Sequence, residues 1–165
     1  MTTNVTFQAR INGQEVTATV SPRTLLVDFL RDHLGLTGTH VGCTFEGVCG
    51  ACTVQLDDEA VKSCMLLAGQ ISGHQVLTVE GLAQGGSLHP LQTAFQDAHA
   101  LQCGYCTPGI LMNMSDFIGR NEAPTDDEIR AALVGNLCRC TGYSHIVEAV
   151  RNAAHAIKAR KGAAA

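Results

Sequence analysis

Residues 102–109 read Gln-Cys-Gly-Tyr-Cys-Thr-Pro-Gly, and residues 138–140 read Cys-Arg-Cys. These stretches supply four thiols, as a CxxC pair and a CxC pair, with residues 107–137 between the pairs. Neither pair alone can close a four-coordinate metal site, whereas both together can if the intervening chain folds back. The predicted ligands of this site are Cys103, Cys106, Cys138 and Cys140.

The segment after Cys106 has the pattern of a helix. Thr107 is a good N-cap residue and Pro108 suits the first helical position. Apolar residues then recur at helical spacing as far as Ile118. The partial positive charge at a helix N-terminus favours a negatively charged, thiolate-ligated centre. At this point a structural zinc site, an iron–sulfur site and a pair of merely buried cysteines all remain possible.

The composition indicates a globular protein with one good core or two small ones. The chain has 165 residues, of which 45% are apolar and 16% are charged, and a formal net charge of −4. This mildly acidic balance predicts no nucleic-acid binding. No apolar run is long enough for a transmembrane helix, and no signal peptide precedes the first strand pattern. We therefore expect a cytoplasmic protein without a transmembrane segment.

Cysteine is abundant, with eight residues in the chain. An even number is compatible with disulfides in a secreted protein. However, cysteines two or three positions apart chelate more readily than they pair with each other, and clustered cysteines in the cytosol are usually metal ligands. We therefore expect metal ligation rather than disulfides.

The first half of the chain has the element order of a β-grasp domain. Residues 5–20 alternate in polarity around Asn12-Gly13, which is a type I′ turn signal and predicts a hairpin. Thr24 can cap a helix that runs to Leu34, and Gly35 ends it. Strands are expected at residues 53–56, 61–64 and 76–79.

The other four cysteines lie within this half and are the first group in chain order, and the four ligands predicted above are the second group. Three cysteines of the first group are close in sequence and the fourth is remote: Cys43, Cys49, Cys52 and Cys64. This arrangement resembles that of plant-type ferredoxins, Cys-x4-Cys-x2-Cys followed by a distant Cys. The surrounding glycines suit a loop that wraps a cluster, because glycine lets backbone N–H groups approach sulfur without steric cost.

A change in composition divides the chain. We predict a β-grasp domain at residues 1–79, a linker at 80–90, a helical domain at 91–160 and a tail at 161–165. Helices are expected at residues 91–99, at 107–120, after the Thr125/Glu128 capping box, and from Ser144 to about Lys158. The predicted fold class is α+β: a β-grasp domain followed by a four-helix bundle.

Four stretches together resemble the small iron–sulfur subunit of bacterial molybdenum hydroxylases, the xanthine dehydrogenase, aldehyde oxidase and carbon monoxide dehydrogenase family. They are residues 50–54, 88–92, 101–109 and 135–143, and the similarity extends from Val5 to about Ile157. The resemblance implies one [2Fe–2S] cluster in each domain. It assigns the first group of four cysteines to the N-terminal cluster and the second group to the helical cluster.

The resemblance also implies partners. In that family a large subunit holds a molybdopterin cofactor, here expected to be the cytosine dinucleotide, and Gln102 and Cys140 match the residues that contact it. A medium subunit holds FAD, and the assembly is a heterotrimer or a dimer of heterotrimers. The implied function is electron transfer from molybdenum through both clusters to flavin, so we expect the chain to be an enzyme subunit with no catalytic residues of its own.

One departure from the family pattern is visible. Thr44 to Val48 make the first cysteine interval one residue longer than the plant-type spacing. We expect the extra residue to bulge at Thr44 to Glu46 and to alter the geometry of that loop.

Other features have simpler interpretations. His40 is expected to be a loop residue near the first cysteine group rather than a ligand, His89 a helix-start residue, and Tyr105 and Tyr143 shields against water. A free two-cluster ferredoxin and a zinc-stabilised interaction module remain as alternative functions. The sequence leaves the substrate open among carbon monoxide, an N-heteroaromatic compound and an aldehyde, and it does not name the terminal acceptor.

Overall fold

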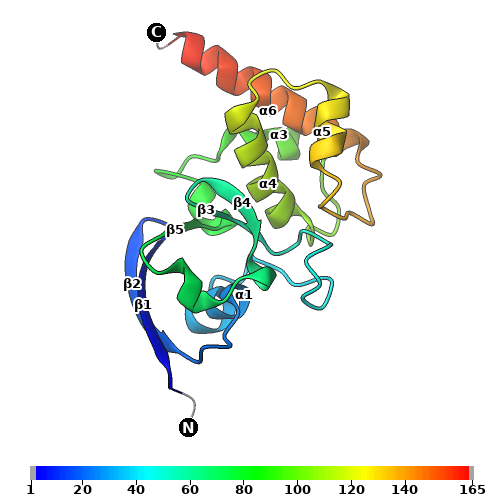
Figure 1. Ribbon diagram of the computed structural model, residues 1–165. Coiled ribbons are helices and arrows are strands. Elements are labelled where there is room, and N and C mark those ends of the chain that lie inside the picture. The colour runs from blue at the N-terminus through cyan, green and yellow to red at the C-terminus, as the bar shows by residue number, and fades with distance from the viewer. Residues whose placement is uncertain (1–2, 164–165) are drawn as a thin grey trace.

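The computed structural model describes residues 3–163 and has two parts. A five-stranded sheet with one helix on its face forms the N-terminal part, and helices α3 to α6 form the C-terminal part (Figure 1). The α+β class predicted from the sequence is confirmed. Among the described residues no helix is both long enough and apolar enough to cross a membrane.

The N-terminal hairpin forms as predicted. Strands β1 (Val5–Ile11) and β2 (Gln14–Val20) pair antiparallel from Val5 opposite Val20 to Ile11 opposite Gln14. Asn12 and Gly13 both have positive φ, 50° and 80°, which a type I′ turn requires. The alternation along β1 buries Phe7, Ala9 and Ile11 on one face.

The helix that follows differs in detail from its prediction. It begins as α1 (Leu26–Asp28) and continues as a wider π-helical turn, Phe29–His33, in which the Leu34 N–H donates to the Phe29 carbonyl. The predicted cap at Thr24 is wrong, because Leu25 holds the N-cap position and no side chain caps the helix. The helix still buries Leu26, Phe29 and Leu30 against the sheet.

The sheet is completed by three short strands, β3 (Thr53–Leu56), β4 (Glu59–Lys62) and β5 (Gln75–Leu77). The strand order is β2-β1-β5-β3-β4, with β1 and β5 parallel and the other pairs antiparallel. Strand β5 is the last in sequence, but it lies in the middle of the sheet and pairs with β1, the first strand. This mixed order is the β-grasp arrangement that the element sequence predicted.

The segment between the parts is more structured than the predicted linker. It contains α2 (Val79–Leu82), whose Leu82 is buried in the core of the helical part. Helices α3 (Pro90–Asp97), α4 (Thr107–Arg120) and α5 (Asp126–Ala132) follow. The last helix, α6 (Ser144–Ala163), continues into the segment that we predicted as a tail, so that prediction is wrong for residues 161–163, and residues 164–165 lie outside the described range.

The predicted helix starts have mixed outcomes. The Thr125/Glu128 capping box forms in full, and His89 caps α3 by accepting from the Leu91 N–H at 3.2 Å. Thr107 is not the cap of α4, however, because Cys106 occupies that position and Thr107 is the first helical residue.

Helix α4 attaches the helical part to the sheet. The Gln55 side chain on β3 donates to the Met112 carbonyl at 3.1 Å and to the Ser115 hydroxyl at 2.6 Å. The buried Asp116 carboxylate on α4 accepts from the Ala60 N–H of β4 at 2.9 Å. These buried polar contacts fix α4 against β3 and β4. The CxxC pair formed by Cys103 and Cys106 lies at the N-terminus of α4.

Candidate iron–sulfur sites

The eight cysteines are free thiols in two groups of four. The loop before β3 carries Cys43, Cys49 and Cys52, and Cys64 lies in the 3-10 turn after β4. We call this group the first cysteine site. The second cysteine site combines Cys103 and Cys106, just before α4, with Cys138 and Cys140, between α5 and α6. The structure thus brings together both groups that the sequence predicted.

Backbone N–H groups converge on one sulfur of the first site. The Cys43 sulfur accepts hydrogen bonds from the backbone N–H groups of Cys49, Val48 and Glu46. These bonds lower the pKa of the Cys43 thiol to about 7, and the Cys49 N–H contributes most. Such a ring of donors stabilises a thiolate, which is the form that ligates metal. Cys64 differs, because burial and then its contact with Cys52 raise its pKa to about 12.

The extra residue in this loop is accommodated by an outward turn. Thr44 and Phe45 both lie in the left-handed region, with φ of 54° and 68°, and residues 44–46 are exposed. The Glu46 N–H donates to the Cys43 carbonyl at 3.3 Å and closes the turn. The predicted bulge therefore lies where the sequence placed it, and the N–H groups after it still reach the Cys43 sulfur.

The second site is held by contacts among its own loops. The Cys140 and Cys103 sulfurs lie 3.5 Å apart, and the Cys106 sulfur hydrogen-bonds to that of Cys138. Burial is the main cause that raises the pKa of Cys106 to about 12. Burial also acts to raise the pKa of Cys138, but hydrogen bonds from Thr141 and Cys140 outweigh it and lower that pKa.

The sulfurs of each site form two pairs. The pairs are Cys43 with Cys49, Cys52 with Cys64, Cys103 with Cys140, and Cys106 with Cys138. Within residues 3–163 no three His, Cys, Asp or Glu side chains converge as one metal ion requires. A tetrahedral zinc site needs four ligands around one point, whereas a binuclear cluster needs two for each iron. The pairing fits the binuclear cluster.

A second observation at the second site also fits a bound group. The Thr107 hydroxyl is buried and has no hydrogen-bond partner among the described residues. A buried hydroxyl without a partner is costly, and a sulfur-rich centre beside Cys106 offers an acceptor. The orphaned hydroxyl thus agrees with a site that is completed by a cofactor.

Two tyrosines support the cysteine loops through their hydroxyls. The Tyr143 hydroxyl accepts from the Cys138 N–H at 2.7 Å and donates to the Asn136 carbonyl at 3.0 Å. The Tyr105 hydroxyl donates to the Val41 carbonyl at 2.7 Å, so it links the two cysteine loops. We expected only shielding from these tyrosines, since their hydroxyl partners are not readable from sequence.

His40 is engaged by Tyr105. Their rings stack with centroids 4.5 Å apart, and the His40 Nδ1 lies 2.8 Å from the Tyr105 carbonyl. This contact is a second link between the cysteine loops, and it places His40 in the loop near the first cysteine site.

The two sites differ in exposure. In the first site Cys49, Cys52 and Cys64 are buried, whereas Cys103 and Cys140 of the second site are exposed. Gln102 is also exposed and directly precedes Cys103. The two residues predicted to contact the pterin, Gln102 and Cys140, therefore lie on one open surface, and their contact with a cofactor stays a prediction.

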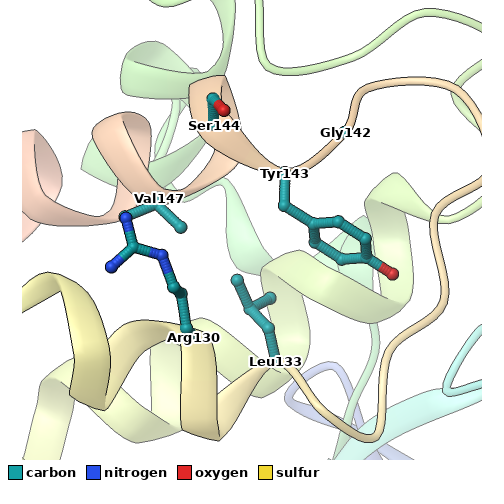
Figure 2. Close-up of a pocket in the computed structure, with 6 residues that line it drawn as sticks. All are labelled: Arg130, Leu133, Gly142, Tyr143, Ser144 and Val147. Carbon is teal, nitrogen blue, oxygen red and sulfur yellow. The ribbon is translucent and has the colours of Figure 1, made fainter.

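One cavity of the structure has no cysteine in its lining. It has a volume of about 320 Å³ and lies between α5 and the start of α6 (Figure 2). Figure 2 shows the Tyr143 ring beside Leu133, with Arg130 farther away on the other side of Leu133. Arg130 is already paired with Asp127 at 2.8 Å. The cavity is lined by Arg130, Leu133, Gly142, Tyr143, Ser144 and Val147, which offer no nucleophile with a base.

Comparisons with known proteins identify both parts. Residues 9–83 match a 2Fe-2S iron-sulfur cluster binding domain, and residues 78–151 match a [2Fe-2S] binding domain. The caffeine dehydrogenase subunit gamma of a Pseudomonas species is 52% identical over 86% of each chain. The nicotine 6-hydroxylase small subunit of Paenarthrobacter nicotinovorans is 48% identical over 96% of this chain and 94% of its own.

A solved structure agrees with these matches. The quinoline 2-oxidoreductase of Pseudomonas putida 86 superposes with a TM-score of 0.91 at 46% identity, and the match covers 97% of this chain and 98% of that one. The molecule is thus a protein with two [2Fe–2S]-binding domains. It belongs to the family of small iron–sulfur subunits of molybdenum hydroxylases, which are the electron-transfer subunits of multi-subunit dehydrogenases.

Proposed function

We propose that this chain carries electrons from a large molybdopterin-binding subunit to a subunit that binds FAD, in a heterotrimer or a dimer of heterotrimers. The second cysteine site faces the pterin and the first site faces the flavin. When bound, each [2Fe–2S] cluster accepts and releases single electrons. The chain's own residues hold the clusters, exclude water from the three buried cysteines of the first site, and fix the spacing between the sites.

The observation that carries the proposal is the contrast between the two cysteine sites. The second site has two exposed cysteines, Cys103 and Cys140, and the exposed Gln102 directly precedes Cys103. Electron transfer between subunits needs a short, dry path, and a partner that covers this surface provides one. We therefore assign Gln102 and Cys140 as the residues that contact the partner's pterin.

The ligand assignment follows from the pairing of the sulfurs. We propose that Cys43 and Cys49 hold one iron of the first cluster, and Cys52 and Cys64 the other. In the second cluster the pairs are Cys103 with Cys140 and Cys106 with Cys138. Two close pairs in each site support this assignment.

We further propose that the assembled enzyme hydroxylates an N-heteroaromatic compound. The three relatives reported above carry names that refer to caffeine, nicotine and quinoline, and all three molecules contain aromatic nitrogen heterocycles. Each match covers most of both chains, so the similarity extends over the surfaces that meet partner subunits.

Purification through a tag on this chain, from its own host and in mild salt, tests the proposal. We expect to recover a much larger subunit that contains molybdopterin, together with a flavoprotein. Turnover with quinoline, nicotine and caffeine, compared with an aldehyde and carbon monoxide, tests the substrate class. Recovery of the chain alone would favour a free ferredoxin, and turnover of only the aldehyde or carbon monoxide would contradict the substrate class.

A further inference from the structure

A single hydrogen bond connects the backbones of the two cysteine sites. The Leu137 N–H donates to the Cys49 carbonyl at 2.8 Å. Cys49 belongs to the first site, and Leu137 directly precedes Cys138 of the second. A path from the Cys138 sulfur to the Cys49 sulfur therefore runs through covalent bonds and one hydrogen bond.

The Asn136 side chain lies beside this hydrogen bond and is only 1% exposed. Its amide donates to the Gly50 carbonyl at 3.2 Å, and its oxygen accepts from the Asn113 amide at 2.6 Å. Asn113 belongs to α4 and also donates to the Ala132 carbonyl at 2.9 Å. Asn136 thus ties the first cysteine loop to the core of the helical part.

Glycines allow the backbones to meet directly. A Cβ atom at Gly109 of α4 would lie 2.1 Å from the Gly50 carbonyl oxygen. A Cβ atom at Gly50 would lie 2.2 Å from the Gly135 carbonyl oxygen and 2.4 Å from the Asn136 amide nitrogen. No side chain fits between the loops at these points, so the contact is backbone against backbone.

We propose that Asn136 is a positioning residue for electron transfer between the two sites, and that the hydrogen bond from Leu137 to Cys49 is the connection that the electron crosses. This inference rests on the proposed function, in which both sites hold clusters and act in series. The step moves one electron from the site of Cys138, which is oxidised, to the site of Cys49, which is reduced. No covalent bond forms or breaks.

The physical reason is the steep loss of electronic coupling as a gap opens. Without the Asn136 side chain, the Gly50 carbonyl keeps only its bonds from Thr53 and the Asn113 amide keeps only the Ala132 carbonyl. The side-chain link between the loops is then lost, and the loops separate to admit water. The cysteine ligands remain in place, so the effect falls on the spacing between the sites rather than on the sites themselves.

The test compares Asn136→Ala with the native chain and with Gln55→Ala in the assembled, cluster-loaded protein. Gln55 is a matched control, because it is also a buried amide that links the two parts through α4, but it does not contact a cysteine loop. The readouts are iron content, the EPR signal of each reduced cluster, the magnetic interaction between the two reduced clusters, and the rate of electron transfer between them after rapid partial reduction.

We expect Asn136→Ala to keep its iron and both EPR signals, to lose part of the magnetic interaction, and to transfer electrons between the sites several-fold more slowly. Gln55→Ala should match the native protein in both intercluster readouts. Native interaction and native rate in Asn136→Ala would overturn the inference. An equal effect in Gln55→Ala would also overturn it, since the spacing would then depend on the whole interface.

A second variant covers the case in which Asn136→Ala loses a cluster. Asn113→Ala removes the support of the Asn136 oxygen and leaves its bond to Gly50, so a smaller change in the same two readouts supports the inference and no change overturns it. A native chain that shows fewer than two clusters would instead contradict the proposed function, so the two failures are distinguishable.

Discussion

At the scale of single residues, the Thr107 hydroxyl is buried at an energetic cost that a bound group would remove. It is buried next to a cysteine that the sequence predicts as a ligand, and it lacks a partner among the residues that the structure describes. A hydrogen bond from this hydroxyl to a sulfur of the second cluster would satisfy it. Such bonds raise the reduction potential, because they stabilise the more negative reduced state.

We therefore predict that Thr107→Val lowers the reduction potential of the second cluster and leaves that of the first unchanged. Valine has a similar shape and lacks the donor. Thr107→Ser keeps the hydroxyl and should retain the native potential. An EPR-monitored redox titration of the loaded protein measures both clusters, and an unchanged potential in Thr107→Val would show that the hydroxyl has no role in tuning.

Gln102 gives a prediction about the partner. Its side chain is exposed, so in the isolated chain Gln102→Ala should change stability by no more than about 0.5 kcal/mol. In the complex, a pterin group that loses this buried partner costs about 1–3 kcal/mol. The variant should keep its iron and both EPR signals but lose pterin content or turnover.

Gln96→Ala is the matched control for Gln102→Ala, because Gln96 is an exposed glutamine on α3 away from the cysteines. It should leave turnover and pterin content unchanged. Full activity in Gln102→Ala would show that the proposed pterin contact is absent. Loss of the second cluster would show instead that Gln102 supports the ligand loop.

At the scale of elements, α4 is the helix on which both parts depend. Its N-terminus carries Cys106, its middle contacts β3 and β4 through Met112, Ser115 and Asp116, and its close approach to the first cysteine loop depends on Gly109. Two glycines in this helix have opposite surroundings. A Cβ atom at Gly109 would clash with the Gly50 backbone, whereas one at Gly119 meets nothing within 4 Å.

We predict that Gly109→Ala destabilises the protein by about 1–3 kcal/mol, because neither backbone can move without separating the loops. Gly119→Ala should be neutral or stabilising by about 0.5–1 kcal/mol, since it only lowers the entropy of the unfolded helix segment. Thermal or urea unfolding of the two variants gives the comparison. Equal stability of both variants would contradict the close backbone approach.

At the scale of the whole molecule, the two cysteine sites have unlike surroundings. The first lies in a loop of a β-grasp domain with three buried cysteines, and the second lies between helices with two exposed ones. Cluster potentials respond to hydrogen bonding and to exposure. The two clusters should therefore be spectroscopically distinct.

We predict about four irons per chain and two EPR components in the dithionite-reduced protein, as two binuclear clusters require. Iron analysis and EPR of the protein purified without air provide the measurement. Half of this iron and a single component would mean that one site stays empty, and the lengthened loop at Thr44 to Glu46 would then be the first candidate. Stoichiometric zinc would support the zinc-stabilised module instead.

The sequence by itself determined the features that depend on near neighbours. The CxxC and CxC cysteine pairs, the Asn12-Gly13 turn, the bounds of α4 and the Thr125/Glu128 capping box are each set by residues a few positions apart. Local geometry decides such features, so spacing and turn chemistry are enough to predict them. The family resemblance added the cofactors and partners, which spacing alone left open.

Only the tertiary structure decided how the distant segments meet. Asn136 bonds to Gly50 across 86 positions, and no local pattern predicts that contact. Local patterns also missed three features: Cys106 rather than Thr107 holds the N-cap of α4, the first helix widens after Asp28, and α6 continues to Ala163. The spacing between the two cysteine sites belongs to this second class, because it follows from the close approach of two loops that are distant in the sequence.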